Sequence, residues 1–181
     1  MPRKPRVNIE DGIYHAFARG NNRMALFYDD EDRGGYLRLL ERVAGVKDWR
    51  CLAFCLMTNH IHLMIETPEA NLSSGMQTLQ GRYAQGFNFR HGRSGHVFEG
   101  RYGAVLIESD VHLRAAAAYI ARNPVDAALC ERPESWAWSS YRATIGAEVP
   151  PWLDTRRLLR FFGSDIEAAR RAYAGMVAQA L

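Results

Sequence analysis

Lysine is nearly absent from this chain of 181 residues, in which only Lys4 and Lys47 are lysine among 23 basic residues. The rest are arginine, whose planar guanidinium suits bidentate contacts with phosphate. A G+C-rich coding sequence would produce the same bias, so composition alone does not separate the two explanations. The position of the arginines along the chain is therefore more informative than their number.

Cysteines and long apolar runs are also scarce. The three cysteines, Cys51, Cys55 and Cys130, are odd in number and lie in or beside apolar segments, which favours buried thiols over a disulfide. The longest apolar run, residues 52–57, is far too short to span a bilayer, and residues 2–6 lack the apolar stretch of a signal peptide. We therefore expect a cytoplasmic protein with no membrane partner.

The composition, with 48% apolar and 24% charged residues, indicates one globular domain. Apolar residues that alternate with polar ones indicate strands, and apolar residues at helical spacing indicate helices. Together they predict the order strand, helix, strand, strand, helix, strand. The expected ranges are 13–18, 30–46, 50–57, 60–66, 72–88 and 102–107. Only residues 58–59 separate the middle strands, so these should form an antiparallel hairpin. The order predicts an α+β fold, a ferredoxin-like βαββαβ antiparallel sheet with two helices on one face and the other face open to a ligand.

A third helix is expected from Asp110 to Asn123, because Pro124 biases the residue before it away from helical geometry. Tyr119 and Asn123 are one turn apart and share a face of this helix. A hydroxyl and a carboxamide oxygen would then lie together, although a packed tyrosine and a C-terminal Asn cap explain the pair more simply. Two short helices, around 153–162 and 166–178, are expected to follow.

The most informative motif is His60-Ile61-His62, inside a β-branched and apolar run. Strand side chains alternate with period two, so both imidazoles should leave the same face. Two neutral imidazoles are half of a divalent-metal site, and a site with fewer than four protein ligands keeps positions open for a substrate oxygen. Two histidines on the solvated face of a half-buried strand are an equally good explanation from spacing alone.

A basic stretch runs from residue 82 to residue 101, with aromatic residues such as Tyr83 and Phe98 among the arginines. Cations that contact the backbone and rings that stack on bases are typical of surfaces for single-stranded nucleic acid. The same aromatic residues are equally well explained as the core side of a helix.

Four ordered motifs then point to one family. They are Arg-Gly-Asn-Asn-Arg at 19–23, the histidine motif within 55–63, the basic segment 93–102, and Tyr-Ile-Ala-Arg-Asn-Pro-Val at 119–125. Together they resemble the signatures of the REP-associated tyrosine transposases, over about residues 7–145. The resemblance implies a nuclease domain with a His-hydrophobic-His motif at residues 1–145. Residues 146–181 form a C-terminal helical extension, for which the resemblance implies no role.

This resemblance implies cleavage and rejoining of single-stranded DNA at hairpin-forming sequences through a 5′-phosphotyrosine link. It implies Tyr119 as the catalytic nucleophile, and His60, His62 and Asn123 as ligands of Mg²⁺ or Mn²⁺. In the insertion-sequence relatives a glutamine commonly stands four residues after the tyrosine. Asn123 is shorter, as in the REP-associated branch, so its direct contact with a metal is the weakest part of the ligand set.

The implied partner is single-stranded or hairpin DNA, and the chain is expected to be a monomer or a dimer. The residues expected to contact DNA are Arg3, Lys4, Arg6, Arg19, Asn21, Asn22, Arg23, Arg82, Arg90, Arg93 and Arg101.

Three alternatives remain open from the sequence. A replication initiator or relaxase uses the same two-histidine and tyrosine chemistry. A non-catalytic module would bind hairpin nucleic acid on the open sheet face without a covalent adduct. A structural zinc site would use Cys51, Cys55, His60 and His62, with both cysteines on one strand face.

Overall fold

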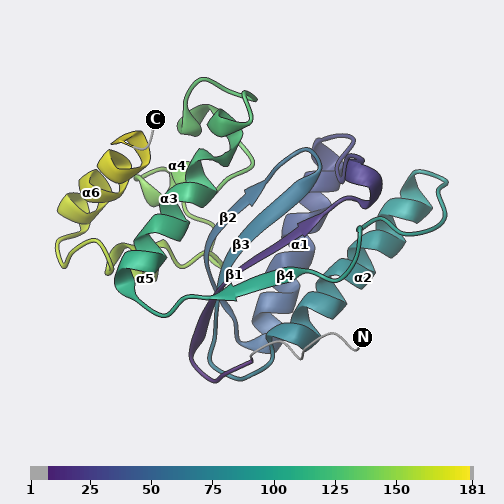
Figure 1. Ribbon diagram of the computed structural model, residues 1–181, viewed down its shortest axis with the longest axis horizontal. Coiled ribbons are helices and arrows are strands. Elements are labelled where there is room, and N and C mark those ends of the chain that lie inside the picture. The colour runs from purple at the N-terminus through teal and green to yellow at the C-terminus, as the bar shows by residue number, and fades with distance from the viewer. Residues whose placement is uncertain (1–7, 180–181) are drawn as a thin grey trace.

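A computed structural model describes residues 8–179, which form a four-stranded antiparallel sheet with helices on both faces (Figure 1). The strands are β1 (Gly12–Arg19), β2 (Arg50–Leu56), β3 (His60–Thr67) and β4 (Gly103–Leu106). Their order is β2-β3-β1-β4, so β3 and β1 are central. This is the order of a ferredoxin-like sheet, and the predicted α+β fold with its hairpin of β2 and β3 is confirmed.

Two long helices cover one face of the sheet. They are α1 (Asp30–Lys47) and α2 (Leu72–Arg90). The start of α1 is capped by Asp29, whose side chain accepts a hydrogen bond from the backbone N–H of Asp32 at 3.0 Å. Side chains at helical spacing on α1, such as Tyr36 and Leu40, are fully buried against the alternate residues of β1 and β3. The first core of the protein therefore lies between this helix pair and the sheet.

The opposite face carries a second core, centred on α3 (Asp110–Asp126). The buried side of α3 is rich in alanine, and Ala117 and Ala121 are almost fully enclosed. Small side chains let this helix lie close to β2 and β3, where it packs on Ala53 and Met64. The sheet face predicted to be open is thus covered over β2 and partly over β3, and remains open only toward β1 and β4. The sequence pattern gave no sign of this partial cover.

The third helix does not end before Pro124, as its sequence predicts, but continues to Asp126. Pro124 is buried, and its carbonyl oxygen accepts a hydrogen bond from the N–H of Leu129 at 2.8 Å. Asn123 and Val125 also accept backbone bonds at this end. Proline disfavours the helix locally, but burial and three satisfied carbonyls keep the last turn in place. As a consequence, Asn123 lies inside the helix and is no terminal cap.

The chain after α3 is bound to the outer edge of β2. It includes the short helical turns η2 (Pro133–Ser135) and α4 (Tyr141–Thr144) and the helices α5 (Thr155–Leu159) and α6 (Ile166–Gln179). The predicted two short C-terminal helices correspond to α5 and α6. Backbone bonds link Leu56 N–H to Trp138 O and Asp154 N–H to Cys51 O, both at 2.8 Å. The division of the chain at residue 145 stays a prediction.

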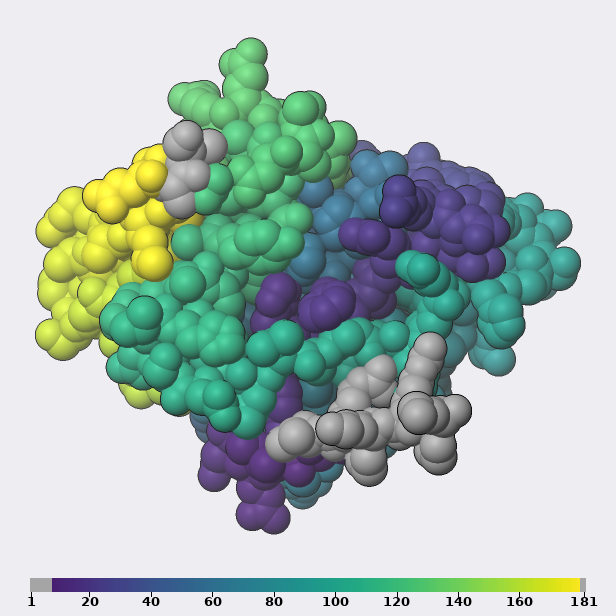
Figure 2. All heavy atoms as spheres, in the orientation of Figure 1, coloured from purple at the N-terminus to yellow at the C-terminus, as the bar shows by residue number. Residues whose placement is uncertain are grey.

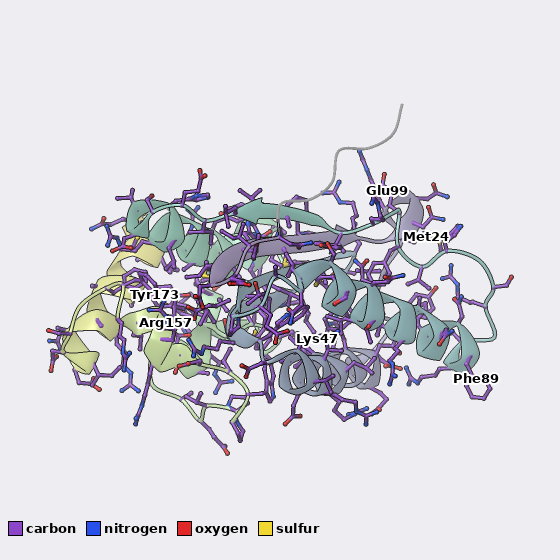
Figure 3. All side chains as sticks on the ribbon, turned by 90° about the horizontal axis from the view of Figure 1, so that it is seen from below. Met24, Lys47, Phe89, Glu99, Arg157 and Tyr173 are labelled. Carbon is purple, nitrogen blue, oxygen red and sulfur yellow. The ribbon has the colours of Figure 1, made fainter. Side chains whose placement is uncertain are left out.

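The helix α6 completes the second core by packing on α3. Tyr173, labelled in Figure 3, is fully buried, and its ring contacts that of Tyr141 at 5.6 Å. Within residues 8–179, none of the helices combines the length and apolarity needed to cross a bilayer.

Two of the cysteines are separated by an irregularity in β2, between Cys51 and Ala53. The extra residue turns Cys51 toward the α1 and α2 core, whereas Cys55 lies in the α3 core. The expectation that both cysteines share a strand face is therefore wrong. Burial raises the pKa of both thiols, which are free and buried, as predicted.

Candidate active site

His60 and His62 lie side by side on the α3 face of β3, as strand alternation predicts. Their ring centroids are 5.1 Å apart and the ring planes are nearly perpendicular. His62 is buried, with 6% of its surface exposed, because β1 and α3 flank it. The solvated-face explanation of the motif is therefore wrong for His62.

The orientation of His60 is fixed by Asn59. The Nδ2 of Asn59 donates to the carbonyl of Arg23 at 3.1 Å, which directs its Oδ1 to His60 Nδ1 at 2.8 Å. Because a carboxamide oxygen only accepts, Nδ1 of His60 must carry the proton. The other ring nitrogen, Nε2, then presents a lone pair to the site.

Asn123 presents a second acceptor to the same point. Its Nδ2 donates to the backbone carbonyl of Tyr119 at 3.0 Å, one turn earlier in α3. Its Oδ1 therefore faces His60 Nε2, at 3.4 Å. Two acceptors facing each other at this distance do not form a hydrogen bond between them, and a cation between them would stabilise the arrangement.

His62 supplies a third acceptor, through a contact that the sequence analysis missed. Its Nδ1 lies 2.9 Å from Nε2 of His15 on β1, within hydrogen-bond distance. Its Nε2 is buried and has no hydrogen-bond partner among residues 8–179. If His62 donates from Nδ1 to His15, its Nε2 is left as an unsatisfied lone pair. Such an atom fits a metal ligand whose other nitrogen is held by a neighbouring side chain.

The histidines are neutral at physiological pH, which is the metal-binding form. Burial, together with the neighbouring His15 and His60, lowers the pKa of His62 to about 3. Burial also lowers the pKa of His15 to about 4, with His112 contributing. The pKa of His60 is lowered as well, mainly by burial. Protonation therefore does not compete with a cation near pH 7.

The donor atoms that could hold a divalent ion here are His60 Nε2, His62 Nε2 and Asn123 Oδ1. Within residues 8–179 there is no cluster of three His, Cys, Asp or Glu side chains that could hold a metal by themselves. The zinc alternative is therefore wrong, since Cys51 lies behind the sheet and Cys55 is enclosed in the α3 core. A metal at this site would use the carboxamide oxygen of Asn123 beside the two histidines and would leave positions for oxygens of a substrate.

Tyr119 stands beside the histidines with 48% of its surface exposed. Its ring centroid lies 5.4 Å from that of His62 and 5.9 Å from that of His15, both in edge contacts. The phenol lines a cleft of about 600 Å³ together with His60 and His62. A packed tyrosine, the simpler explanation from sequence, is therefore wrong. Figure 2 shows this hollow, with atoms of β1 at its floor between α3 and β4.

Residues 8–123, more than half of the chain, match the family described as Transposase IS200 like. The chain belongs to this transposase family. It is therefore an enzyme of DNA transposition. The rival class of replication initiators and relaxases is not favoured by the match.

Individual relatives agree with this family. The transposase is 25% identical over 135 residues to a Haemophilus influenzae protein named as a REP-associated tyrosine transposase, covering 68% of this chain and 74% of that protein. Its fold is similar to a solved REP-associated tyrosine transposase bound to a REP hairpin. That likeness has a TM-score of 0.70 at 16% identity, over 92% of this chain and 93% of the other. The predicted family resemblance is confirmed.

Some of the arginines predicted to contact DNA surround the active-site cleft of the transposase. Arg19 and Arg101 are exposed and line it, with Glu99 between them in the lining. Asn21, Asn22 and Arg23 form the short helix η1 (Asn21–Arg23) directly after β1. Asn22 and Arg23 have φ angles of 50° and 59°, a left-handed turn that ends the strand beside His60. Arg19 and Arg101 thus share the cleft with Tyr119, and the turn of Asn21, Asn22 and Arg23 follows directly after Arg19.

The other predicted arginines lie elsewhere. Arg90 pairs with Asp29 at 2.7 Å and Asp32 at 2.5 Å, so its charge is largely matched within the protein. Arg93 lies over the rings of Tyr28 and Phe87 and donates to the Tyr28 hydroxyl. Arg82 is exposed on α2, and Tyr83 and Phe98 belong to the core. Arg3, Lys4 and Arg6 lie outside the described residues.

His15 lines the cleft of this transposase and contacts His62, and sequence reasoning missed it. The signal was available, since His15, Phe17 and Arg19 alternate on β1 in the way that His60 and His62 do on β3. Their proximity depends on the register of β1 against β3, which pairs Phe17 with His62. A single sequence does not specify this register.

Proposed function

We propose that this transposase cuts single-stranded DNA next to a hairpin and becomes linked to it through Tyr119. The observation that carries the proposal is that the exposed phenol of Tyr119 lines one open cleft with His60 and His62, where Asn123 Oδ1 lies 3.4 Å from His60 Nε2 and the buried Nε2 of His62 has no partner among residues 8–179. Metal-dependent phosphoryl transfer uses a hydroxyl nucleophile beside side chains that can bind a cation.

The proposed step is an in-line displacement at phosphorus. The Tyr119 oxygen loses its proton and forms a bond to the scissile phosphorus, while the bond from phosphorus to the 3′ oxygen breaks. The 3′ oxygen leaves as a hydroxyl after it gains a proton, and the 5′ phosphate stays on the tyrosine. One phosphodiester replaces another, so a 3′ hydroxyl can later attack the phosphotyrosine and rejoin strands without ATP.

The chain's own residues position the reactants. The packing of α3 holds Tyr119 over the sheet, and the exposed Arg19 and Arg101 can hold phosphates of the strand by paired hydrogen bonds. His60, His62 and Asn123 would hold Mg²⁺ or Mn²⁺, with the imidazoles favouring Mn²⁺. Such an ion, when bound, polarises a phosphate and stabilises charge on its oxygens.

Hairpin DNA with an unpaired flank is the proposed substrate. The support is the likeness to a REP-associated transposase solved with a REP hairpin, together with the open cleft lined by arginines. A backbone phosphate must approach the Tyr119 phenol in the cleft between α3 and the sheet, which an unpaired strand can do more readily than a stiff duplex. A blunt duplex should therefore be a poor substrate.

The proposal is tested with hairpin oligonucleotides from around the gene, labelled at either end and incubated with protein and Mn²⁺. On a denaturing gel the 3′ label should migrate with the protein, whereas the 5′ label should leave on a shortened strand. Tyr119→Phe deletes only the nucleophilic oxygen and should abolish the adduct while DNA affinity is kept. Tyr28→Phe is the control, since Tyr28 is 49% exposed and lies outside the cleft.

Three outcomes would contradict the proposal. An adduct formed by Tyr119→Phe would identify a different nucleophile. A 5′ label on the protein would mean the opposite polarity of cleavage. Binding by the wild-type protein with no adduct on any substrate would favour the non-catalytic module.

A further inference from the structure

Phe17 is an exposed aromatic residue on the floor of the active-site cleft. It lies on β1 between His15 and Arg19, and 39% of its surface is exposed. Its ring centroid is 5.6 Å from that of His15 and 6.3 Å from that of His62. Isolated exposed apolar residues are common on proteins, so exposure by itself indicates no role. A role for Phe17 needs a second observation, which the neighbouring strand β4 provides.

Gly103 on β4 is the register partner of Phe17. A Cβ atom at this position would lie only 2.4 Å from two atoms of the Phe17 ring, which real contacts do not permit. The ring thus lies across β4 in space that any other residue at 103 would occupy. Glycine weakens a strand interior and often marks a close approach by another group. Here the group is the ring, which is held by the sheet and still faces the cleft.

The side chains around the Phe17 ring are of the kinds that contact the phosphate and the base of a nucleotide. Arg19 and Arg101 supply exposed cations for phosphates, and they line the same cleft as Phe17. His62 contacts both Phe17 and Tyr119, so a base on Phe17 would belong to a nucleotide next to the attacked phosphate. Exposed rings among arginines are the elements with which proteins bind single strands, and stacking tolerates any base.

We propose that Phe17 is a stacking platform for an unpaired base next to the scissile phosphate, an inference that rests on the proposed strand cleavage at Tyr119. The platform selects unpaired substrate, because in a duplex both faces of each base are covered by stacked neighbours. It also fixes the strand in the cleft, so that one phosphate is presented to the phenol.

The test compares Phe17→Leu with wild-type protein on an intact hairpin oligonucleotide and on two abasic versions. Each abasic version lacks one of the bases that flank the cleaved phosphate. Phe17→Leu should slow adduct formation about tenfold or more on the intact strand at subsaturating DNA. One abasic site should slow the wild-type protein similarly, and on that strand the variant should cause no further loss. Phe17→Trp should retain the rate.

The matched control is Phe89→Leu. Phe89 is 93% exposed at the far end of α2, away from the cleft that Glu99 lines, as Figure 3 shows for both residues. Its replacement should leave the rate on every strand unchanged. Circular dichroism and thermal unfolding of each variant establish that the fold is intact.

A binding measurement separates this inference from the proposed cleavage. In Tyr119→Phe protein, 2-aminopurine at the flanking position should be quenched on binding, and Phe17→Leu should remove the quenching. Quenching without any wild-type adduct would overturn cleavage but support the platform. The platform would be overturned if Phe17→Leu slowed adduct formation further on both abasic strands. Quenching of 2-aminopurine that survives Phe17→Leu would overturn it as well.

Discussion

At the scale of single residues, His15 contacts Nδ1 of His62, one of the proposed metal ligands. Since the two rings are joined through His62 Nδ1, removal of His15 frees that nitrogen and lets the ring turn or change its protonation. His15→Ala should therefore weaken Mn²⁺ binding about 10- to 100-fold, as is usual for the partner of a metal-ligating histidine. Mn²⁺ titration by calorimetry or electron paramagnetic resonance measures this.

Two variants control this prediction. His15→Gln keeps an acceptor near His62 Nδ1 and should recover part of the affinity. His112→Ala changes a histidine on α3 that contributes only electrostatically to His15, and it should have little effect. Wild-type affinity in His15→Ala would show that His62 is oriented by packing alone.

The buried histidines also make stability depend on pH. Burial lowers the pKa of His15 to about 4 and of His62 to about 3, whereas in the unfolded chain each takes up a proton near pH 6.5. Between these values the unfolded state binds more protons, so stability falls as pH falls. With EDTA present, the free energy of unfolding should fall by about 2 kcal/mol per histidine between pH 7 and pH 5.

Urea unfolding at several pH values measures this loss. His15→Gln removes one of the two groups and should make the dependence on pH between 7 and 5 less steep. An equal slope in the variant and the wild-type protein would mean that other groups control acid stability.

At the scale of elements, an ion pair joins the C-terminal helices to the sheet. Glu66 on β3 is 5% exposed and accepts from Arg157 on α5, with Nη2 to Oε1 at 2.9 Å and Nε to Oε2 at 3.1 Å. Although burial raises the pKa of Glu66, the bonds from Arg157 outweigh it, and the pKa is lowered overall. Arg157, labelled in Figure 3, thus keeps a buried carboxylate charged.

Arg157→Ala should therefore destabilise the protein by about 2 to 4 kcal/mol, because it leaves a buried charge with only the longer contact from Arg50 at 3.5 Å. Denaturant unfolding near pH 7 measures the change. The neighbouring Arg156 is exposed, and Arg156→Ala should change stability by less than about 0.5 kcal/mol. Similar losses in both variants would show that the pair adds nothing specific.

The elements differ in how far the sequence determines them. Period-two alternation placed His60 and His62 on one face, and helical spacing placed Tyr119 beside Asn123, because both patterns depend on local geometry. Pro124 led to a wrong prediction of the end of α3, because burial of the last turn outweighs the low helix preference of proline. The attachment of residues 138–140 to β2 could not be predicted, because the backbone bonds and the bonds of the Ser140 hydroxyl to Phe54 join segments far apart in the sequence.

On the scale of the whole molecule, the net charge is only +3, so its distribution matters more than its size. Arg19 and Arg101 lie at the cleft, whereas Arg90 is matched by two aspartates. For three to five phosphate contacts, affinity for the hairpin strand should fall about 10- to 100-fold between 50 and 200 mM NaCl. Fluorescence anisotropy across this range gives the slope.

Arginine variants test whether the phosphate contacts that cause the salt dependence lie at the cleft. Replacing Arg19 and Arg101 together with alanine should make the dependence on salt less steep by about one to two units of logarithmic slope. Arg42→Ala changes an exposed arginine on α1, on the other side of the sheet, and should leave the slope as it is. An unchanged slope in the double variant would place the phosphate contacts elsewhere.

Asn59 links the turn after β1 to His60, one of the proposed metal ligands. Its amide lies between the carbonyl of Arg23, in the turn after β1, and Nδ1 of His60. A strand that shifts this turn would rotate the amide and alter which nitrogen of His60 carries the proton. Binding free energies are linked reciprocally, so the factor by which DNA changes the affinity for the ion equals the factor by which the ion changes the affinity for DNA. If the proposed ion binds His60 and the proposed strand contacts this turn, the Asn59 carboxamide would couple the affinities of the two ligands.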